Sequence, residues 1–196
     1  HFDPPLSLGV DSRVIRTAQV LLLGVCSLGM AQAFWLNVGL ANFNALDFVP
    51  NVMGRTVWFR VNEGTLTPHV ISEDRGGHGI GVGDVNGDGR ADVLGPDGWF
   101  EAPDDPLKGR WIHRAEWSMG SAGISIIAHD FDRDGLTDVF WGMGHDYGLY
   151  WLKQSRDEEG QRTWTRRVVD ETWSQAHGLT LADLDGNRLA RDRRGV

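Results

Sequence analysis

The chain has 196 residues and a formal net charge of −8, with 41% hydrophobic residues. This length supports a sizeable folded core, and the acidic balance excludes a nucleic-acid partner, because phosphate backbones attract basic surfaces. The single cysteine, Cys26, excludes a disulfide within the chain. The 26 glycines and 9 tryptophans, together with short apolar runs, favour an all-β architecture with frequent turns.

The N-terminal segment, residues 1–33, overlaps an apolar stretch, because residues 18–40 carry no charge. Three interpretations are open. In the first, the stretch is a signal peptide, with Arg13 and Arg16 as its basic flank and residues 31–33 as its cleavage site. In the second, it is a membrane anchor, since it is long enough to span a membrane. In the third, residues 34–39 are the first strand of the fold. Cleavage after Ala33 is compatible with such a strand. We therefore expect an exported protein, extracellular or periplasmic, with no membrane partner unless the apolar segment is retained as an anchor.

Internal repeats organise the rest of the chain. Three segments align on an acidic loop, with steps of 46 and 53 residues, and the loops begin at Asp84, Asp130 and Asp183. A fainter upstream copy places Asp47 45 residues before Asp92, but its loop lacks the other acidic residues, so we expect no metal there. The third loop is damaged, because Arg188 and Arg191 replace the expected glycine and acid.

Each repeat has the same order of expected strands. An apolar strand enters the acidic loop, a second strand leaves it, a short aromatic strand follows a turn, and a more polar strand closes the unit. In chain order, these strands are expected at residues 56–60, 66–71, 80–82, 92–94, 98–101, 111–115, 124–126, 138–140, 148–152, 164–169 and 179–181. Four strands in about 45 residues is the blade period of a β-propeller.

The predicted fold is therefore all-β, a partial β-propeller with about three four-stranded blades and part of a fourth. The incomplete propeller covers residues 34–187, with blades at about residues 34–74, 78–117 and 122–172 and a partial blade at residues 176–187. The tail, residues 188–196, is basic and pattern-free, and we expect it to be frayed. Trp58, Trp99 and Trp151 recur at one place in each blade, which indicates packing of blade against blade rather than a carbohydrate platform.

Two of the acidic loops carry a complete set of candidate metal ligands. In the first Asp loop (residues 84–92) and the second Asp loop (residues 130–138), side chains at positions 1, 3, 5 and 9 and the carbonyl at position 7 can converge on one cation. The ligands are Asp84, Asn86, Asp88, Asp92 and the carbonyl of Arg90, then Asp130, Asp132, Asp134, Asp138 and the carbonyl of Leu136. Oxygen ligands with several carboxylates suit Ca²⁺. An EF-hand is excluded because position 12 is Gly95 or Trp141 instead of glutamate; the open alternative is an Asp/Gly-rich turn without metal.

The two Asp loops and their blade-like spacing resemble FG-GAP or VCBS repeats, the calcium-loop repeats of integrin-like propellers, over about residues 34–187. The resemblance implies Ca²⁺ at both loops, a role for the ion in holding each blade together, and an exported protein with a binding or scaffold role. The integrin-like signatures are only partly present, with Gly95-Pro96 as a remnant. A cell-adhesion role is therefore not implied.

Three histidines fall on the face of the predicted propeller opposite the Asp loops. Two of them hold the same place in their repeats, six residues before Asp84 and Asp183, and the third lies in a glycine-rich turn. Converging imidazoles suit Zn²⁺ or another divalent transition metal, or general acid–base work. The candidate catalytic residues are His78, His145 and His177, and the candidate second metal or substrate site adds Asp97 and Asp146. The alternative is that each histidine caps a turn or bonds a neighbouring backbone group. His129, beside the second Asp loop, and His69 and His113, on outer strands, are assigned to structure.

A weaker resemblance concerns residues 77–101. The segments Gly77-His78-Gly79-Ile80-Gly81 and Pro96-Asp97-Gly98-Trp99-Phe100-Glu101, on either side of the first Asp loop, are similar to the propeller part of aldos-2-ulose dehydratases. Those proteins are metal-dependent sugar lyases, so this resemblance implies dehydration of a keto-sugar, with histidine as acid–base group or metal ligand. The sequence leaves open whether the chain is an enzyme and whether its ligand is a protein or a carbohydrate.

Overall fold

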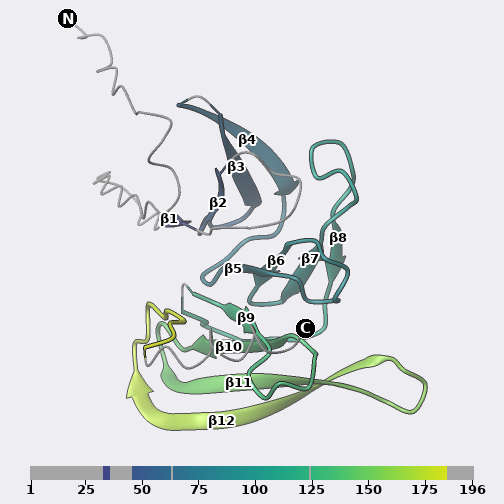
Figure 1. Ribbon diagram of the computed structural model, residues 1–196. Helices are drawn as coiled ribbons and strands as arrows, with labels where there is room; N and C mark the ends of the chain where they lie inside the picture. The colour runs from purple at the N-terminus through teal and green to yellow at the C-terminus, as the bar shows by residue number, and fades with distance from the viewer. Residues whose placement is uncertain (1–32, 36–45, 63, 124, 185–196) are drawn as a thin grey trace, which may run out of the picture. The chain divides into compact units, whose positions relative to one another are not determined.

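The computed structural model describes residues 33–35, 46–62, 64–123 and 125–184 (Figure 1). These residues form strands, turns and bends, and no helix in this part of the chain is long and apolar enough to cross a membrane. They belong to the second of the two units into which the chain divides, Ala31–Val196. Most of the expected N-terminal segment and the whole expected basic tail lie outside the described residues.

The described strands form three four-stranded sheets in which every neighbouring pair is antiparallel. The first sheet contains β1 (Ala33–Trp35), β2 (Leu46–Pro50), β3 (Thr56–Asn62) and β4 (Thr65–Ser72). The second contains β5 (Gly81–Gly83), β6 (Asp92–Gly95), β7 (Gly98–Glu101) and β8 (Ile112–Arg114). The third contains β9 (Ile127–His129), β10 (Asp138–Gly142), β11 (Tyr147–Arg156) and β12 (Arg162–Ser174). In each sheet the strands follow chain order, so each is an open meander, and the all-β prediction is confirmed (Figure 1).

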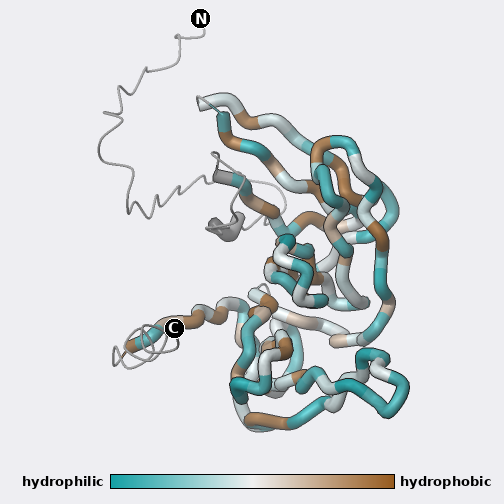
Figure 2. Tube along the Cα trace, turned by 45° about the vertical axis from the view of Figure 1, so that its right-hand side comes forward, coloured by the Kyte–Doolittle hydropathy of each residue, from teal (hydrophilic) through white to brown (hydrophobic). Residues whose placement is uncertain are grey.

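The middle strands contain the most buried positions of the sheets, the first strands β5 and β9 are half-buried, and the last strands β4, β8 and β12 are largely exposed. Val93 on β6 and Trp99 on β7 are almost fully buried, whereas Ile112 on β8 and Trp173 on β12 are exposed. β-Branched and aromatic residues suit the middle strands, because their side chains pack well on a pleated surface. Hydrophobic and hydrophilic residues therefore mix in short stretches along the described chain (Figure 2).

Two tryptophans join neighbouring sheets through apolar clusters. Trp58 of the first sheet belongs to a buried cluster with Val93 and Phe100 of the second sheet. Trp99 of the second sheet belongs to another cluster, which includes Trp141 of the third sheet. The prediction that the repeated tryptophans pack sheet against sheet is confirmed for Trp58 and Trp99. Trp151 holds the equivalent place in the third sheet, where it is half-buried with the Arg167 guanidinium 5.0 Å from its ring centre.

Close backbone contacts join the second and third sheets at their first strands. The Ile126 N–H donates to the Ile80 carbonyl at 2.8 Å, next to a parallel bridge between Ile80 and Ser125. Gly81 permits this approach, because a Cβ built there would lie 2.1 Å from the Ile126 carbonyl oxygen. The strand expected at residues 124–126 is therefore displaced: Ile126 bonds to the second sheet, and β9 begins only at Ile127.

Residues 175–184 form no strand, so the strand prediction at residues 179–181 is wrong. A strand needs a hydrogen-bonded neighbour, and the start of this segment bonds instead to the turn between β10 and β11. The Ala176 N–H donates to the Met143 carbonyl at 2.9 Å, and the Gln175 N–H donates to the Asp146 carbonyl at 3.2 Å. The rest of the expected partial blade, residues 185–187, lies outside the described residues.

Candidate metal sites

The first Asp loop connects β5 to β6, and its first carboxylate folds the loop. Asp84 Oδ1 accepts hydrogen bonds from the N–H groups of Gly87 at 2.7 Å and Asp88 at 3.1 Å. Asp84 Oδ2 accepts from the N–H of Gly89 at 2.8 Å. Gly87 and Gly89 both have positive φ, 79° and 84°, which glycine adopts without a Cβ penalty. One side chain thus collects three backbone donors and sets the path of the loop.

The second Asp loop connects β9 to β10 and repeats this arrangement. Asp130 accepts from the N–H groups of Arg133 at 2.7 Å, Asp134 at 3.1 Å and Gly135 at 3.0 Å. Arg133 takes the place of Gly87 and has a φ of 64°, in the left-handed region that costs an L-residue free energy. The two loops therefore share one backbone path, although their residues differ.

The ninth residue of each loop is a fully buried aspartate that ties the loop to the rest of its sheet. Asp92 and Asp138 are both 0% exposed. Asp92 accepts from the N–H of Val85, inside the loop, and from the N–H of Ala102, just after β7, both at 2.9 Å. Asp138 makes the corresponding bonds with the N–H groups at positions 131 and 154, at 3.3 and 2.9 Å.

Burial disfavours the ionised form of these two carboxylates and so raises their pKa values. Burial raises the pKa of Asp92 from 3.8 to about 7, repulsion from Asp88 and Asp84 adds to the effect, and the two N–H donors oppose it. Burial also raises the pKa of Asp138. A cation within each loop would favour the charged form of both side chains.

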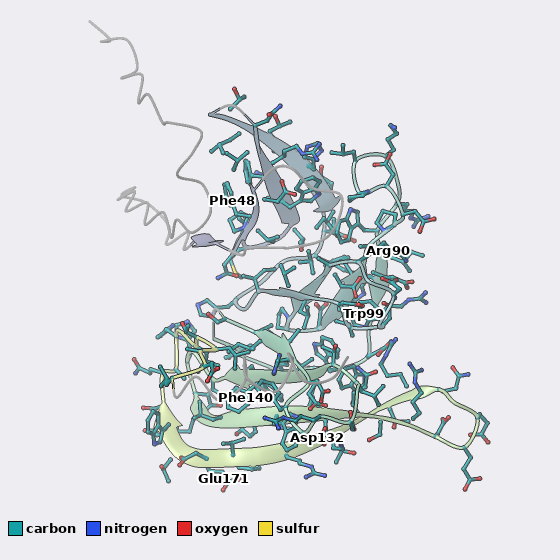
Figure 3. All side chains as sticks on the ribbon, in the orientation of Figure 1. Phe48, Arg90, Trp99, Asp132, Phe140 and Glu171 are labelled. Atoms are coloured by element: carbon teal, nitrogen blue, oxygen red, sulfur yellow. The ribbon has the colours of Figure 1, made fainter. Side chains whose placement is uncertain are left out.

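The middle ligands of the two loops have different neighbours. In the first loop, Asn86 Nδ2 donates to Asp88 Oδ2 at 2.7 Å, and the Arg90 guanidinium lies 2.5 Å from the same oxygen. In the second loop, the Lys153 ammonium contacts both Asp132 Oδ2 and Asp134 Oδ2, the latter at 2.6 Å. Figure 3 labels Arg90 and Asp132, which mark the two loops.

The acidic ligands converge to different degrees in the two loops. In the second loop, Asp130, Asp132 and Asp138 each offer an oxygen within 4.8 Å of the others, which makes them a group that could hold a metal ion. The first loop has Asn86 in place of one such carboxylate. The N–H groups at position 7, of Arg90 and Leu136, donate to the fifth-position aspartates at 2.9 Å. The ligand role of their carbonyl oxygens stays a prediction.

A second possible metal-holding group is formed by three histidines from distant parts of the chain. His78 precedes β5, His145 lies between β10 and β11, and His177 follows β12. Their ring centres are 4.6 to 5.7 Å apart, and one nitrogen of each lies within 4.8 Å of the others. The structure therefore brings together the three candidate catalytic histidines.

Backbone groups of the segment before β9 and of the turn between β10 and β11 hold His78 in place. His78 Nδ1 lies 2.8 Å from the Ala122 carbonyl oxygen. Since a carbonyl only accepts, Nδ1 carries the proton in this contact, and Nε2 keeps its lone pair for a metal or a proton. Gly144 lies against the ring, because a Cβ built there would be 3.0 Å from His78 Cε1. A side chain at position 144 would thus disturb the histidine group.

The two aspartates predicted beside the histidines are held elsewhere. Asp97 Oδ2 bonds to Arg75 Nη1 at 2.9 Å, and Asp97 Oδ1 lies 3.8 Å from His113 Nε2. Asp146 Oδ1 accepts from the N–H of Tyr147 in its own turn. Neither carboxylate belongs to the histidine group.

The histidines assigned to structure make aromatic contacts. His69 stacks on Trp58 with ring centres 4.3 Å apart, and His113 packs against Phe100 at 5.0 Å. Burial lowers the pKa of His113. His129 lies 5.3 Å from Phe131, at the start of the second Asp loop.

Sequence reasoning missed two residues beside the second Asp loop. Lys153 contacts two of its carboxylates, and Gln154, only 1% exposed, donates from Nε2 to the Val85 carbonyl at 3.1 Å and the Thr137 carbonyl at 2.6 Å. Both lie on β11, at most sixteen residues after Asp138, and no motif or repeat spacing in the sequence indicates that they contact the loop. Their place follows only from the pairing of β10 with β11, in which Val139 faces Leu152.

Comparisons of the chain with protein-family models, curated proteins and solved structures give no match.

Proposed function

We propose that the three sheets are consecutive blades of a β-propeller module, and that Ca²⁺ bound in the two Asp loops stabilises it. The observation that carries this proposal is the duplicated loop geometry. In both loops the first carboxylate collects three backbone donors, and a fully buried ninth carboxylate ties the loop to its sheet. Such a repeated arrangement of oxygen ligands suits a hard divalent cation.

The arrangement of the sheets supports the propeller part of the proposal. Each sheet is a four-stranded meander, and the first strands of the second and third sheets approach through the Ile80 and Ile126 backbone contact. In a propeller, the first strands of neighbouring blades lie side by side around the central axis. Bound Ca²⁺ would offset the repulsion among the loop carboxylates and favour ionised Asp92 and Asp138. We propose a binding or scaffold role in an exported protein, with a protein or carbohydrate as ligand.

Calcium titration tests the proposal. Isothermal titration and thermal melting with Ca²⁺ should show binding and stabilisation, by about 2.7 kcal/mol per loop at a free Ca²⁺ concentration about 100-fold above Kd. Asp88→Ala and Asp134→Ala should each remove one site. Asp105→Ala is the matched control, because Asp105 pairs with Lys108 and lies outside both loops. Absence of binding heat and of a melting shift in the parent chain would refute the calcium proposal.

A second candidate function rests on the histidine group. Three imidazoles that converge, with His78 oriented by the Ala122 carbonyl, suit Zn²⁺ or another divalent transition metal and leave a coordination position for a substrate or water. The weaker resemblance to aldos-2-ulose dehydratases makes a carbohydrate lyase the reaction class to test. In such a dehydration, a base removes the proton from the carbon beside the sugar carbonyl, an acid protonates the hydroxyl group of the next carbon, and that hydroxyl leaves as water while a double bond forms between the two carbons.

Metal binding and activity test this candidate separately. In saturating Ca²⁺, the parent chain should bind Zn²⁺ or Co²⁺, and His78→Gln should lose most of that affinity. His113→Gln is the matched control, because His113 packs against Phe100 away from the group. Equal Zn²⁺ affinity in the parent and in His78→Gln would refute the metal site. Metal binding without conversion of keto-sugars would support the metal site and refute the lyase assignment.

A further inference from the structure

Lys153 occupies the second Asp loop with its own positive charge. The residue lies on β11, and its side chain is largely buried, 18% exposed. Its ammonium contacts one oxygen of Asp132 and one oxygen of Asp134, two of the four carboxylates predicted to hold Ca²⁺. A cation with more than one carboxylate partner is already present where the metal would bind.

The second sheet has glutamate at the equivalent position. Asp138 accepts from the N–H of residue 154, and Asp92 accepts from the N–H of residue 102, so Lys153 and Glu101 stand at the same place, one residue earlier. The Glu101 carboxylate does not contact the first Asp loop but pairs with Arg114, whose Nη2 lies 2.7 Å from Glu101 Oε2. The lysine is therefore a feature of the third sheet and not of the repeat.

The second loop, which has the lysine, also has one carboxylate more than the first loop. Position 3 is Asp132 in the second loop and the neutral Asn86 in the first. Asp132 is one of the two partners of Lys153. The second loop thus has one more negative charge and one built-in positive charge that offsets it.

Arg90 does not play the same part in the first loop. It contacts a single loop carboxylate, Asp88, and its other donors bind the Ala102 carbonyl and Asp104, which lie outside the loop. Asp84 has no cationic partner among the described contacts of the first loop. A metal ion can therefore enter the first loop while Arg90 keeps its outer partners.

We infer that Lys153 is an internal counter-ion that competes with Ca²⁺ for the second Asp loop, so that this loop binds Ca²⁺ more weakly than the first. This inference rests on the proposed calcium function. Ca²⁺ must displace the ammonium from Asp132 and Asp134, which costs two charge-assisted hydrogen bonds.

Reciprocal substitutions in the full chain test the inference. In an Asp88→Ala background, where only the second loop can bind, Lys153→Met keeps the side-chain length and removes the charge. Isothermal titration with Ca²⁺ should then show about fivefold tighter binding, the upper end of what the loss of an ion pair near the surface is worth. In an Asp134→Ala background, Glu101→Lys should weaken binding to the first loop. Lys108→Met is the control, because Lys108 is 84% exposed and, within the described part of the chain, pairs with Asp105 and with no residue of the Asp loops.

Thermal melting gives a second measurement. In chelator, Lys153→Met should melt at lower temperature than the parent, because Asp132 and Asp134 lose their counter-ion. Ca²⁺ should raise the melting temperature of this variant by more than it raises that of the parent. Lys153→Gln should behave in the same way and serves if the methionine variant does not fold.

The outcomes separate the inference from the function on which it rests. Calcium affinities of the second loop within about twofold between the parent and Lys153→Met, or equal Ca²⁺ responses in melting, would overturn the inference and leave the calcium sites standing. No Ca²⁺ uptake by any variant would overturn both.

Discussion

The two Asp loops fold along one path but are neutralised in different ways. In both, the first aspartate collects three backbone donors and the ninth is fully buried. The first loop has Asn86 and leaves Glu101 turned toward Arg114, whereas the second has Asp132 and the Lys153 ammonium. Backbone geometry and charge compensation are therefore set separately: the shared aspartates build both loops, whereas only the second loop receives a cation from a neighbouring strand, Lys153 on β11.

The largest expected effect comes from the pH dependence of the buried Asp92. Its pKa is raised to about 7 in the fold, against 3.8 for an ordinary aspartate, so between these pH values the folded chain holds a proton that the unfolded chain has lost. In chelator, stability should therefore fall as pH rises from about 4 to about 7, by about 4 kcal/mol at most. Urea unfolding at a series of pH values measures this.

Two comparisons sharpen the pH prediction. The side chain in Asp92→Asn cannot ionise, so the stability of this variant should decrease less as pH rises. The parent saturated with Ca²⁺ should show no such decrease in stability, because the ion favours the charged carboxylate. An equally steep fall in Asp92→Asn would show that other groups cause it.

The next effect concerns Gln154, which the second sheet replaces with Ala102. Gln154→Ala gives the third sheet the residue of the second, but it leaves the Val85 and Thr137 carbonyls without their donor and opens a cavity. We expect a loss of about 3 kcal/mol in unfolding free energy. Chemical denaturation measures it, with Gln161→Ala, an exposed glutamine in the β11–β12 turn, as the control. A change no larger than that of the control would mean that Gln154 does not link the sheets.

The smallest effect concerns the one backbone position at which the two loops differ in strain. Arg133 has positive φ where the first loop has Gly87. Arg133→Gly should stabilise the chain by about 1 kcal/mol, and Gly87→Ala should destabilise it by a similar amount, because only glycine adopts this conformation without steric cost. No atom lies within 4 Å of a Cβ built at Gly87, so the glycine variant tests conformation and not packing. Shifts of the same sign in the two variants would contradict this explanation.

The local parts of the structure could be predicted from the sequence. The hydrogen bonds within each Asp loop span seven residues or fewer, as from Gly89 to Asp84 and from Val85 to Asp92, so nine residues carry the information needed to build the loop. Most strand positions followed from the alternation of apolar residues and from the glycine-rich turns. The strand expected at residues 179–181 failed because a strand depends on a partner that a local pattern does not supply.

Tertiary structure alone decided which side chains meet. His78, His145 and His177 come together through contacts such as His78 Nδ1 to the Ala122 carbonyl, between residues 44 positions apart, whereas Asp97 turns away to Arg75. Lys153 reaches the second Asp loop only because β11 pairs with β10 in one register. The sequence by itself determined the backbone path of the loops, whose internal hydrogen bonds are local. Tertiary contacts brought the three histidines together, and the register of β11 on β10 gave the second loop its counter-ion.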